Sequence, residues 1–241
     1  MKNYNLDLHI HSVLSPCASL VMTPENILHQ ANKIGLDIIA ITDHNSAKNV
    51  EVTMQLAKKY NIDVIPGMEI ESSEEIHLLC YFPYLENLLA WQEIVYNNLP
   101  EMENDEEYFG YQLITDKKDQ YKAKEKRMLA TATDLTLSQI VTQVKKLKGI
   151  VIPSHVDKSY GIIKNLGFIP EDLDLKILEI SKKSDINKVK KEYSYLQKYN
   201  LLKNSDSHYL KEIKIMYKSD FTTFNFENLF KNLKDANFVL N

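Results

Sequence analysis

Two histidines lie two residues apart near the start of the chain, in the stretch Asp7-Leu8-His9-Ile10-His11. Alternate side chains of a β-strand point to the same face, so His9 and His11 would face one way, with Asp7 behind them. Two imidazoles in this arrangement can grip a divalent metal ion, and a carboxylate on the same face can orient one of them. Taken alone, the pair also fits two ordinary histidines near a strand end.

Further histidines and carboxylates follow later apolar segments of the chain. The segments that read as strands are Leu36–Ile41, Asp63–Ile65, Ile76–Phe82, Ile150–Pro153, Lys176–Ile180 and Leu201–Leu202. Parallel strands that alternate with helices bring their carboxyl ends to one face, where active sites collect. We therefore expect six of the seven histidines and two carboxylates to meet at one mouth, namely His9, His11, His44, His77, His155, His208, Glu69 and Asp206.

Helix signals lie between these segments. The expected helices are Pro24–Ile34 (Thr23 as N-cap, Gly35 as its end), Ser46–Tyr60, Thr136–Leu147, Ile186–Tyr199 and Phe226–Ala236. The only histidine outside the motifs, His29, falls in the first helix and is expected at the surface or in packing. This alternation of strand and helix predicts an α/β fold, a parallel sheet or barrel in a single domain over residues 1–241.

Residues 100–133 are more polar and follow no barrel repeat. They predict an insertion or lid beside the main fold, with a hairpin near Asp116–Asp119. Its basic run from Lys117 to Arg127 reads as a solvated surface, with contact to the mouth as the alternative.

The composition is that of a soluble globular protein, with 241 residues, 44% hydrophobic and 26% charged. A net charge of −4 gives no reason to expect tight non-specific binding to a polyanion, but allows a small acidic substrate held by metals. No signal-like or membrane-length apolar run is present, so we expect a cytoplasmic protein without a membrane partner. Cys17 and Cys80 cannot form a disulfide framework, and Cys80 is expected in the core.

Imidazole and carboxylate ligands suit Zn²⁺, Mn²⁺ or Fe²⁺. Eight candidate ligands are more than one structural zinc ion uses, so a centre of two or three ions fits better, with a carboxylate such as Glu69 bridging two of them. Such a centre can generate a metal-bound hydroxide at neutral pH and neutralise a phosphoryl oxygen in the transition state. The residues therefore predict hydrolysis of a phosphate ester.

Six motifs together resemble the PHP family, the polymerase and histidinol phosphatase metallohydrolases. They occur in the family's order: DLHIHS at Asp7–Ser12, ITDHN at Ile41–Asn45, PGMEI at Pro66–Ile70, the strand with His77, PSHVD at Pro153–Asp157, and SDSHY at Ser205–Tyr209. The resemblance implies a distorted (β/α)7, TIM-like barrel with a trinuclear metal centre. It marks the chain as similar to bacterial stand-alone PHP proteins.

The resemblance also implies how the ligands are shared. One ion would be held by His9, His11, Glu69 and Asp206, a second by Glu69, His77 and His155, and a third in part by His44 and His208. Catalysis would involve Glu69, Asp206 and His208, with Asp43 in a supporting or loop-capping role. Family members often supply an Asp or His a few residues after the HxH pair, whereas this chain has Ser15-Pro16-Cys17-Ala18-Ser19. We therefore expect two tightly bound ions and a labile third.

Lys158 follows His155 by three residues and is the candidate for binding a substrate phosphate, with a solvated lysine as the alternative. The leading function is a metal-dependent phosphoesterase acting on a small phosphomonoester, such as a nucleotide or sugar phosphate, or on an oligonucleotide end. One alternative is a catalytically weak, metal-stabilised binding or scaffold domain, and another is hydrolysis of a C–N bond at a similar site. The residues leave the substrate, the native metals and the oligomeric state open.

Overall fold

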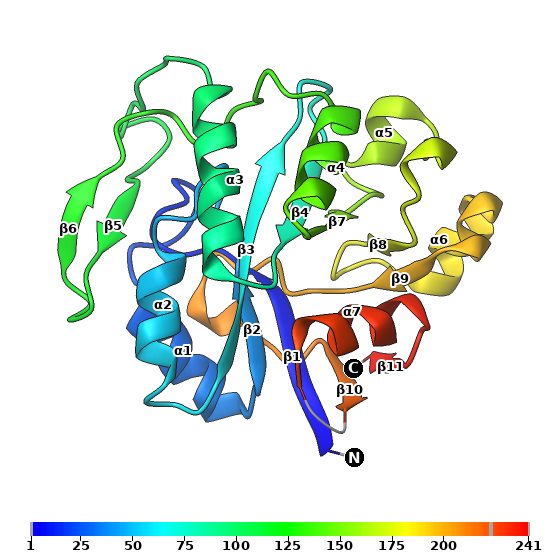
Figure 1. Ribbon diagram of the computed structural model, residues 1–241, viewed down its shortest axis with the longest axis horizontal. Helices are drawn as coiled ribbons and strands as arrows, with labels where there is room; N and C mark the ends of the chain where they lie inside the picture. The colour runs from blue at the N-terminus through cyan, green and yellow to red at the C-terminus, as the bar shows by residue number, and fades with distance from the viewer. Residues whose placement is uncertain (1, 222–223, 241) are drawn as a thin grey trace.

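A computed structural model describes residues 2–221 and 224–240, which form a mixed α/β fold (Figure 1). The strands are β1 (Lys2–Ile10), β2 (Ile38–Ile41), β3 (Asp63–Glu71), β4 (His77–Tyr81), β5 (Leu113–Thr115), β6 (Tyr121–Lys124), β7 (Ile150–Pro153), β8 (Ile177–Glu179), β9 (Asn200–Leu202), β10 (Tyr217–Phe221) and β11 (Phe238–Leu240). The α-helices are α1 (Pro24–Ile34), α2 (Val50–Ala57), α3 (Leu85–Asn97), α4 (Leu137–Lys146), α5 (Ile162–Leu166), α6 (Ile186–Glu192) and α7 (Phe226–Lys234).

Seven strands form one curled sheet in the order β11-β10-β1-β2-β3-β4-β7, and β8 and β9 form a separate parallel pair. Backbone hydrogen bonds continue the ring beyond the sheet. The amide of Val156, after β7, donates to Glu179 O of β8 over 2.9 Å, and the amide of Ser207, after β9, donates to His9 O of β1 over 3.3 Å. The predicted α/β, TIM-like fold is confirmed, with a half-barrel of sheet completed by the β8–β9 pair.

Two strands of the sheet run against the expected direction: β10 pairs antiparallel with β1, and β4 is the second. β1, β2 and β3 are parallel, whereas β4 pairs antiparallel with both β3 and β7. The connection from β3 to β4 is a tight turn in which the Ser72 amide donates to Ile76 O over 2.9 Å. A turn this short can join only antiparallel strands, because a parallel pair needs a crossover of a dozen or more residues. The expectation of a wholly parallel sheet was wrong at both strands.

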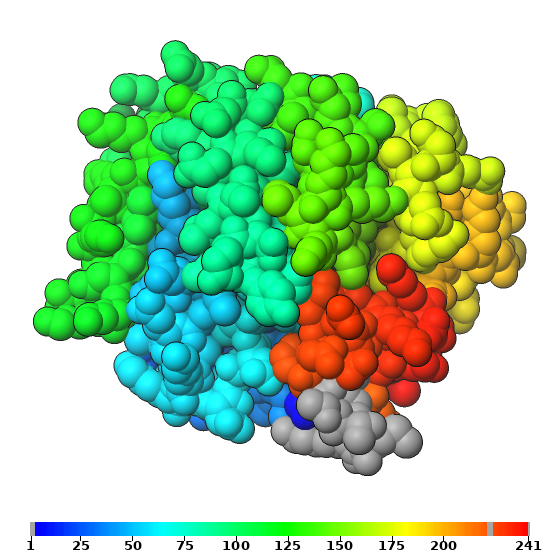
Figure 2. Space-filling view, in the orientation of Figure 1, coloured from blue at the N-terminus to red at the C-terminus, as the bar shows by residue number. Residues whose placement is uncertain are grey.

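Two apolar clusters form the core, one inside the barrel and one between the strands and the outer helices. The inner cluster takes residues from every strand of the ring and is closed at one end by α7, and it includes Leu6, Leu8, Ile38, Ala40, Ile65, Leu79, Tyr81, Ile152, Ile177, Leu202 and Phe230. The outer cluster packs the other strand faces against the helices and includes the buried Cys80. Figure 2 shows α3 and α4 lying side by side on this outer layer.

The helix signals are largely confirmed. Thr23 caps α1 and Gly35 ends it with φ 80°, while Thr136 begins α4 in a reciprocal capping box with Gln139. Two helices are shorter than expected, because α2 starts at Val50 and α6 ends at Glu192, where a 3₁₀ turn follows. None of the helices in the described ranges is long and apolar enough to span a membrane.

The segment 100–133 forms the predicted hairpin, β5 paired antiparallel with β6. It stands at the edge of the molecule beside α1 and α2 (Figures 1 and 2). Two hydrogen bonds help to anchor it: the Leu113 amide donates to Val13 O over 3.0 Å, and Asn45 Nδ2 donates to Leu129 O over 2.7 Å. The segment therefore supports the loops that follow β1 and β2.

Candidate metal centre

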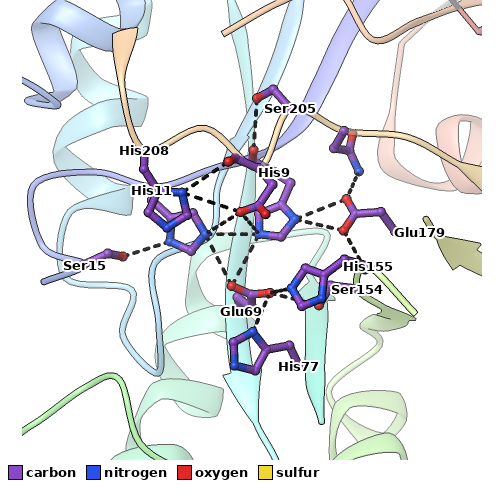
Figure 3. Close-up of polar contacts among 12 residues, drawn as sticks. His9, His11, Ser15, Glu69, His77, Ser154, His155, Glu179, Ser205 and His208 are labelled. Atoms are coloured by element: carbon purple, nitrogen blue, oxygen red, sulfur yellow. Dashed lines mark hydrogen bonds and ion pairs between the residues drawn. The ribbon is translucent and has the colours of Figure 1, made fainter. Parts of the chain in front are cut away.

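Six imidazoles and two carboxylates meet at the mouth of the barrel. They are the eight side chains singled out in the sequence: His9, His11, His44, His77, His155, His208, Glu69 and Asp206. Figure 3 shows Glu69 with His9, His11, His77, His155 and His208 around it. His77 reaches this mouth from the first residue of β4, because the strand is inverted. His29 lies exposed on α1 and takes no part.

Hydrogen bonds behind His9 and His11 fix which ring nitrogen carries the proton. His9 Nδ1 lies 3.1 Å from both oxygens of Glu179, so this nitrogen donates. His11 Nδ1 lies 3.0 Å from Ser15 Oγ, whose single proton is already donated to Asp43 over 2.6 Å. His11 Nδ1 must therefore donate as well. In the neutral form of each ring, the Nε2 atom then carries a lone pair, an assignment made from the chemistry of the hydrogen-bond partners.

These two lone pairs point at each other across only 3.1 Å and at two carboxylate oxygens. Glu69 Oε2 lies 3.4 Å from His9 Nε2 and 3.3 Å from His11 Nε2, and Asp206 Oδ1 lies 3.6 and 3.5 Å from the same atoms. Ligand atoms at zinc-like bond lengths in a tetrahedron are about 3.3–3.6 Å apart. With both imidazoles neutral, the four electron-rich atoms therefore fit around one divalent cation. Without a cation, burial opposes protonation of His9 and His11, but the surrounding carboxylates outweigh burial and raise the pKa values of both rings.

The two oxygens of Glu69 serve different groups of imidazoles. Oε2 faces His9, His11 and His44 Nδ1 (3.3 Å), whereas Oε1 lies 3.3 Å from His77 Nδ1 and 3.3 Å from His155 Nε2. This arrangement suits a carboxylate shared by two ions, one on each oxygen. Backbone bonds hold Glu69 in place, since its amide donates to Asp43 O over 3.2 Å and its carbonyl accepts from Asn45 over 2.8 Å.

A third set of nitrogens lies on the outer side of His11. His11, His44 and His208 each offer a ring nitrogen within 4.8 Å of the others, and the rings of His11 and His208 stack with centroids 4.2 Å apart. Among the described residues this set contains no carboxylate, in keeping with the departure in the Ser15–Ser19 loop. Cys17 of that loop is not part of it.

The pKa values of these groups reflect the negative charge of two carboxylates buried at the mouth. Burial opposes ionisation of Glu69 and Asp206, but His9 and the other neighbouring imidazoles together outweigh burial and lower both carboxyl pKa values. Burial likewise disfavours a proton on His77, yet Glu69 raises the pKa of His77 to about 9. Burial and the neighbouring His11 lower the pKa of His208 to about 4, which leaves that ring neutral at pH 7. Cations at the mouth would supply the positive charge that the carboxylates otherwise draw from protons.

Sequence reasoning gave Asp43 a supporting role, and Asp43 accepts from Ser12 and from Ser15, which lies behind His11. It missed Glu179. Glu179 is buried and accepts from His9 Nδ1, from the His155 amide over 3.1 Å and from Asn204 Nδ2 over 2.7 Å. Its only signal was a carboxylate near the end of a predicted strand. Asp7 was wrongly expected to orient an imidazole; its Oδ1 accepts from the Ser205 amide over 3.0 Å. The pairing of β1 with β2 is irregular between Asp7 and Ile10, so simple alternation does not hold there.

A cavity of about 580 Å³ opens over the centre. Its lining includes His44, Glu69, His77, His155, Asp206 and His208, and the residues Asp157, Lys158, Ser159, Tyr160 and Lys164 of the loop and helix after β7. Lys158 thus lies where the sequence placed it, beside the ligand cluster. The run from Lys117 to Arg127 does not line the cavity, and Arg127 instead donates to Tyr96 O over 2.7 Å.

Two curated relatives match about a third of this chain. A 5′-3′ exoribonuclease of Haemophilus influenzae is 32% identical over 76 residues, covering 30% of this chain and 27% of that protein. A phosphoribosyl 1,2-cyclic phosphate 1,2-diphosphodiesterase of Eggerthella lenta is 28% identical over 78 residues, covering 30% of this chain and 29% of that protein. The matched segments therefore span less than half the length of either relative.

A solved structure resembles the whole chain. The lesion-specific endonuclease Q of Pyrococcus furiosus superposes with a TM-score of 0.73 at 18% identity, covering 98% of this chain and 56% of that one. At this identity the likeness establishes the fold. The PHP domain itself matches residues 7–158, more than half of the sequence, and includes six of the eight side chains gathered at the mouth. This chain therefore belongs to the PHP domain family.

Proposed function

We propose that this chain is a metal-dependent phosphoesterase that hydrolyses a small phosphomonoester or the phosphate of a nucleotide or oligonucleotide end. One observation carries the proposal: the lone pairs of His9 and His11 converge with oxygens of Glu69 and Asp206 at separations of 3.1–3.6 Å. A divalent cation makes that arrangement favourable while the imidazoles stay neutral, and the arrangement lies at the floor of an open cavity.

Two or three divalent ions such as Zn²⁺, Mn²⁺ or Fe²⁺ would be held by the eight side chains. The first would lie among His9, His11, Glu69 and Asp206, and the second beside Glu69, His77 and His155. When bound, such ions activate water and neutralise charge on a phosphoryl group. A third would have His11, His44 and His208, without a carboxylate, so we propose that it binds more weakly.

The protein's own groups would orient and select the substrate. Glu69 fixes the spacing of the two main clusters, and Asp206 reaches the cavity from the segment after β9. His208 lines the cavity as a neutral ring that can accept a hydrogen bond from a substrate or water. Lys158 supplies a positive charge at the edge of the cavity, where the non-reacting oxygens of a phosphate would lie.

The names of the relatives support a phosphate ester as the substrate. One matched protein is named as an exoribonuclease, another as a phosphodiesterase, and the structural neighbour as an endonuclease. All three names describe cleavage of a phosphorus–oxygen ester bond.

The deciding experiment is phosphate release from a panel of compounds with Mn²⁺ supplied. The panel holds sugar phosphates, histidinol phosphate, mononucleotides, 3′,5′-bisphosphates and short oligonucleotides, and Asp206→Asn serves as the control. Turnover of at least one compound, lost in the control, is the expected result. Elemental analysis should find two ions that survive dialysis and a third that does not; three equally retained ions would contradict the weak third site.

If no compound of the panel is hydrolysed although metal ions are bound, the result would favour the scaffold alternative. Hydrolysis of amides without any phosphate release would favour the C–N bond alternative. Either result would replace the phosphoesterase proposal.

A further inference from the structure

Tyr160 lies at the cavity with a backbone conformation that tyrosine rarely adopts. Its φ is +60°, in the left-handed region that favours glycine and asparagine. A non-glycine residue keeps such a conformation only where its surroundings impose it, and such residues gather at functional sites. The local fold does not explain why a tyrosine stands at this position, so its side chain points to a functional role.

The loop that carries Tyr160 is firmly held. Tyr160 O accepts from the amide of His77 over 2.8 Å, which ties the loop to the start of β4. Gly161 is packed so tightly that a Cβ there would lie 2.6–2.7 Å from the carbonyl oxygens of His155, Val156 and Lys158. The ring of Tyr160 is thus presented from a fixed base.

That ring covers a metal-ligand candidate and is itself half-exposed. It stacks on the imidazole of His77 with centroids 5.0 Å apart and an interplanar angle of 19°. The residue is 49% exposed, and within the described parts of the chain its ring has no other aromatic contact and its hydroxyl no hydrogen bond. One face packs on His77, and the remaining surface is free to receive a flat ring from a ligand.

Two ammonium groups accompany the ring along the same cavity. Lys158 and Lys164 both line it, and Lys164 Nζ lies 3.3 Å from the hydroxyl of Tyr193. The cavity, about 580 Å³, lies in the range of sites that hold ligands much larger than a phosphate group. The site therefore combines a phosphate-binding floor, cationic edges and a flat apolar face.

We propose that Tyr160 is a specificity-determining residue: the base of a nucleotide substrate stacks on its ring while the phosphate lies at the Glu69 and Asp206 cluster. The inference rests on the proposed function and narrows it from phosphate esters in general to nucleotides, free or at a strand end. Base stacking on an aromatic side chain tolerates any base, because every base has a π-face.

The test compares AMP with ribose 5-phosphate, which carries the same phosphoribose without a base. We expect Tyr160→Ala to lower the ratio of kcat/KM for AMP to that for ribose 5-phosphate by about tenfold. Tyr160→Phe keeps the flat ring and should retain the wild-type ratio. An unchanged ratio in Tyr160→Ala, or an equal loss in Tyr160→Phe, overturns the inference. A 5′-phosphorylated dinucleotide in place of AMP distinguishes a strand end from a free nucleotide.

A binding measurement separates this inference from the proposed function. In the Asp206→Asn chain, which should leave AMP intact, equilibrium dialysis should show tighter binding of AMP than of ribose 5-phosphate, and Tyr160→Ala should remove the difference. If the wild-type chain releases no phosphate from either compound while the difference in binding persists, the phosphoesterase proposal fails and the stacking role stands. If AMP and ribose 5-phosphate bind equally well, the stacking role fails whatever the activity.

Discussion

The carboxylate behind His9 decides which nitrogen of that ring faces the centre. Glu179 takes the Nδ1 proton, and it also accepts from the His155 amide and from Asn204. It therefore connects a ligand candidate on β1 with the loop after β7 and the segment after β9. Partners of this kind fix ring orientation and raise the basicity of the ligating nitrogen.

Replacing Glu179 by glutamine should weaken metal binding without unfolding the chain. The NH₂ group of glutamine would face N–H groups that now donate to Glu179 and could not accept from them. His9 would therefore lose its fixed orientation. We expect about a 10- to 100-fold loss of affinity for Mn²⁺, measured by calorimetric titration. Glu192→Gln, at an exposed site on α6, is the matched control. Equal affinities in the two variants would show that Glu179 does not act through the ligands.

The ligand candidates could be named from the sequence, whereas of their supports only Asp43 could. His9, His44 and Asp206 each stand in a short motif at the end of an apolar run, so local pattern and barrel geometry locate them. Glu179 meets His9 across 170 residues of sequence, and no local pattern distinguishes it from an ordinary strand carboxylate. Ser15 is a comparable case, because its role depends on Asp43 lying behind it.

The loop after β7 should be destabilised by even the smallest side chain at Gly161. Its φ is not in the left-handed region, so the obstacle is crowding against three carbonyl oxygens. We expect Gly161→Ala to cost about 1–3 kcal/mol, or several degrees in Tm, and to displace Lys158 and Tyr160.

Gly35→Ala provides the comparison for this variant. Gly35 has φ +80° and open space around it, so alanine there adds backbone strain at the end of α1, far along the chain from the cavity. Both variants should unfold at a lower temperature, but only Gly161→Ala should lose the proposed phosphoesterase activity per folded molecule. Full activity in Gly161→Ala would show that the loop can move without consequence.

The insertion is joined to the barrel by an ion pair between the buried Glu125 and the partly exposed Lys48, and the contribution of this pair should depend on pH. Burial opposes ionisation of Glu125, but Lys48 and the Arg127 amide outweigh it and lower its pKa below the ordinary 4.5. A carboxyl with a lowered folded pKa stabilises the fold above its unfolded pKa, and this stabilisation is lost as the pH falls through the folded value.

Glu125→Gln should therefore lower the free energy of unfolding by about 1–3 kcal/mol at pH 7. The gap from wild type should shrink as the pH falls from about 5 to 3, because the wild-type pair is then lost as well. Urea unfolding across this range measures both. Glu106→Gln, which removes the exposed contact with Lys124, should change little. A gap that stays constant with pH would mean that the pair is not what stabilises the insertion. We propose that residues 100–133 unfold together with the barrel as one domain.

The element pattern was predictable where helix caps and apolar runs are local signals. The hairpin near Asp116 and the start of α1 at Thr23 are examples. The reversal of β4 was not foreseen, because His77 fits the mouth equally well from the end of a parallel strand or from the start of an antiparallel one. The decisive signal was the five-residue gap between Glu71 and His77, which is too short for a crossover.

For the whole molecule, metal binding should be a main source of stability. A ligand that binds the folded chain alone stabilises it by about 4 kcal/mol at a thousandfold excess over its Kd. We expect Mn²⁺ to raise Tm by about 8–16 °C and a chelator to reverse this, as measured by differential scanning fluorimetry. Asp206→Asn should show a much smaller response. A wild-type Tm indifferent to both additions would contradict metal binding at the mouth.

The segment from Asn204 to His208 is bound directly to β1. Asn204 Oδ1 accepts from the Leu8 amide across 196 residues of sequence, and the His11 amide donates to Ser207 O. On the ribosome, His9 and His11 therefore emerge well before Asp206 can lie beside them. During that interval the nascent chain exposes two imidazoles without the carboxylate that completes the proposed set of ligands. Full capture of the proposed metal ions would have to follow the pairing of the segment Asn204–His208 with β1, so metal loading would report that this pairing has formed.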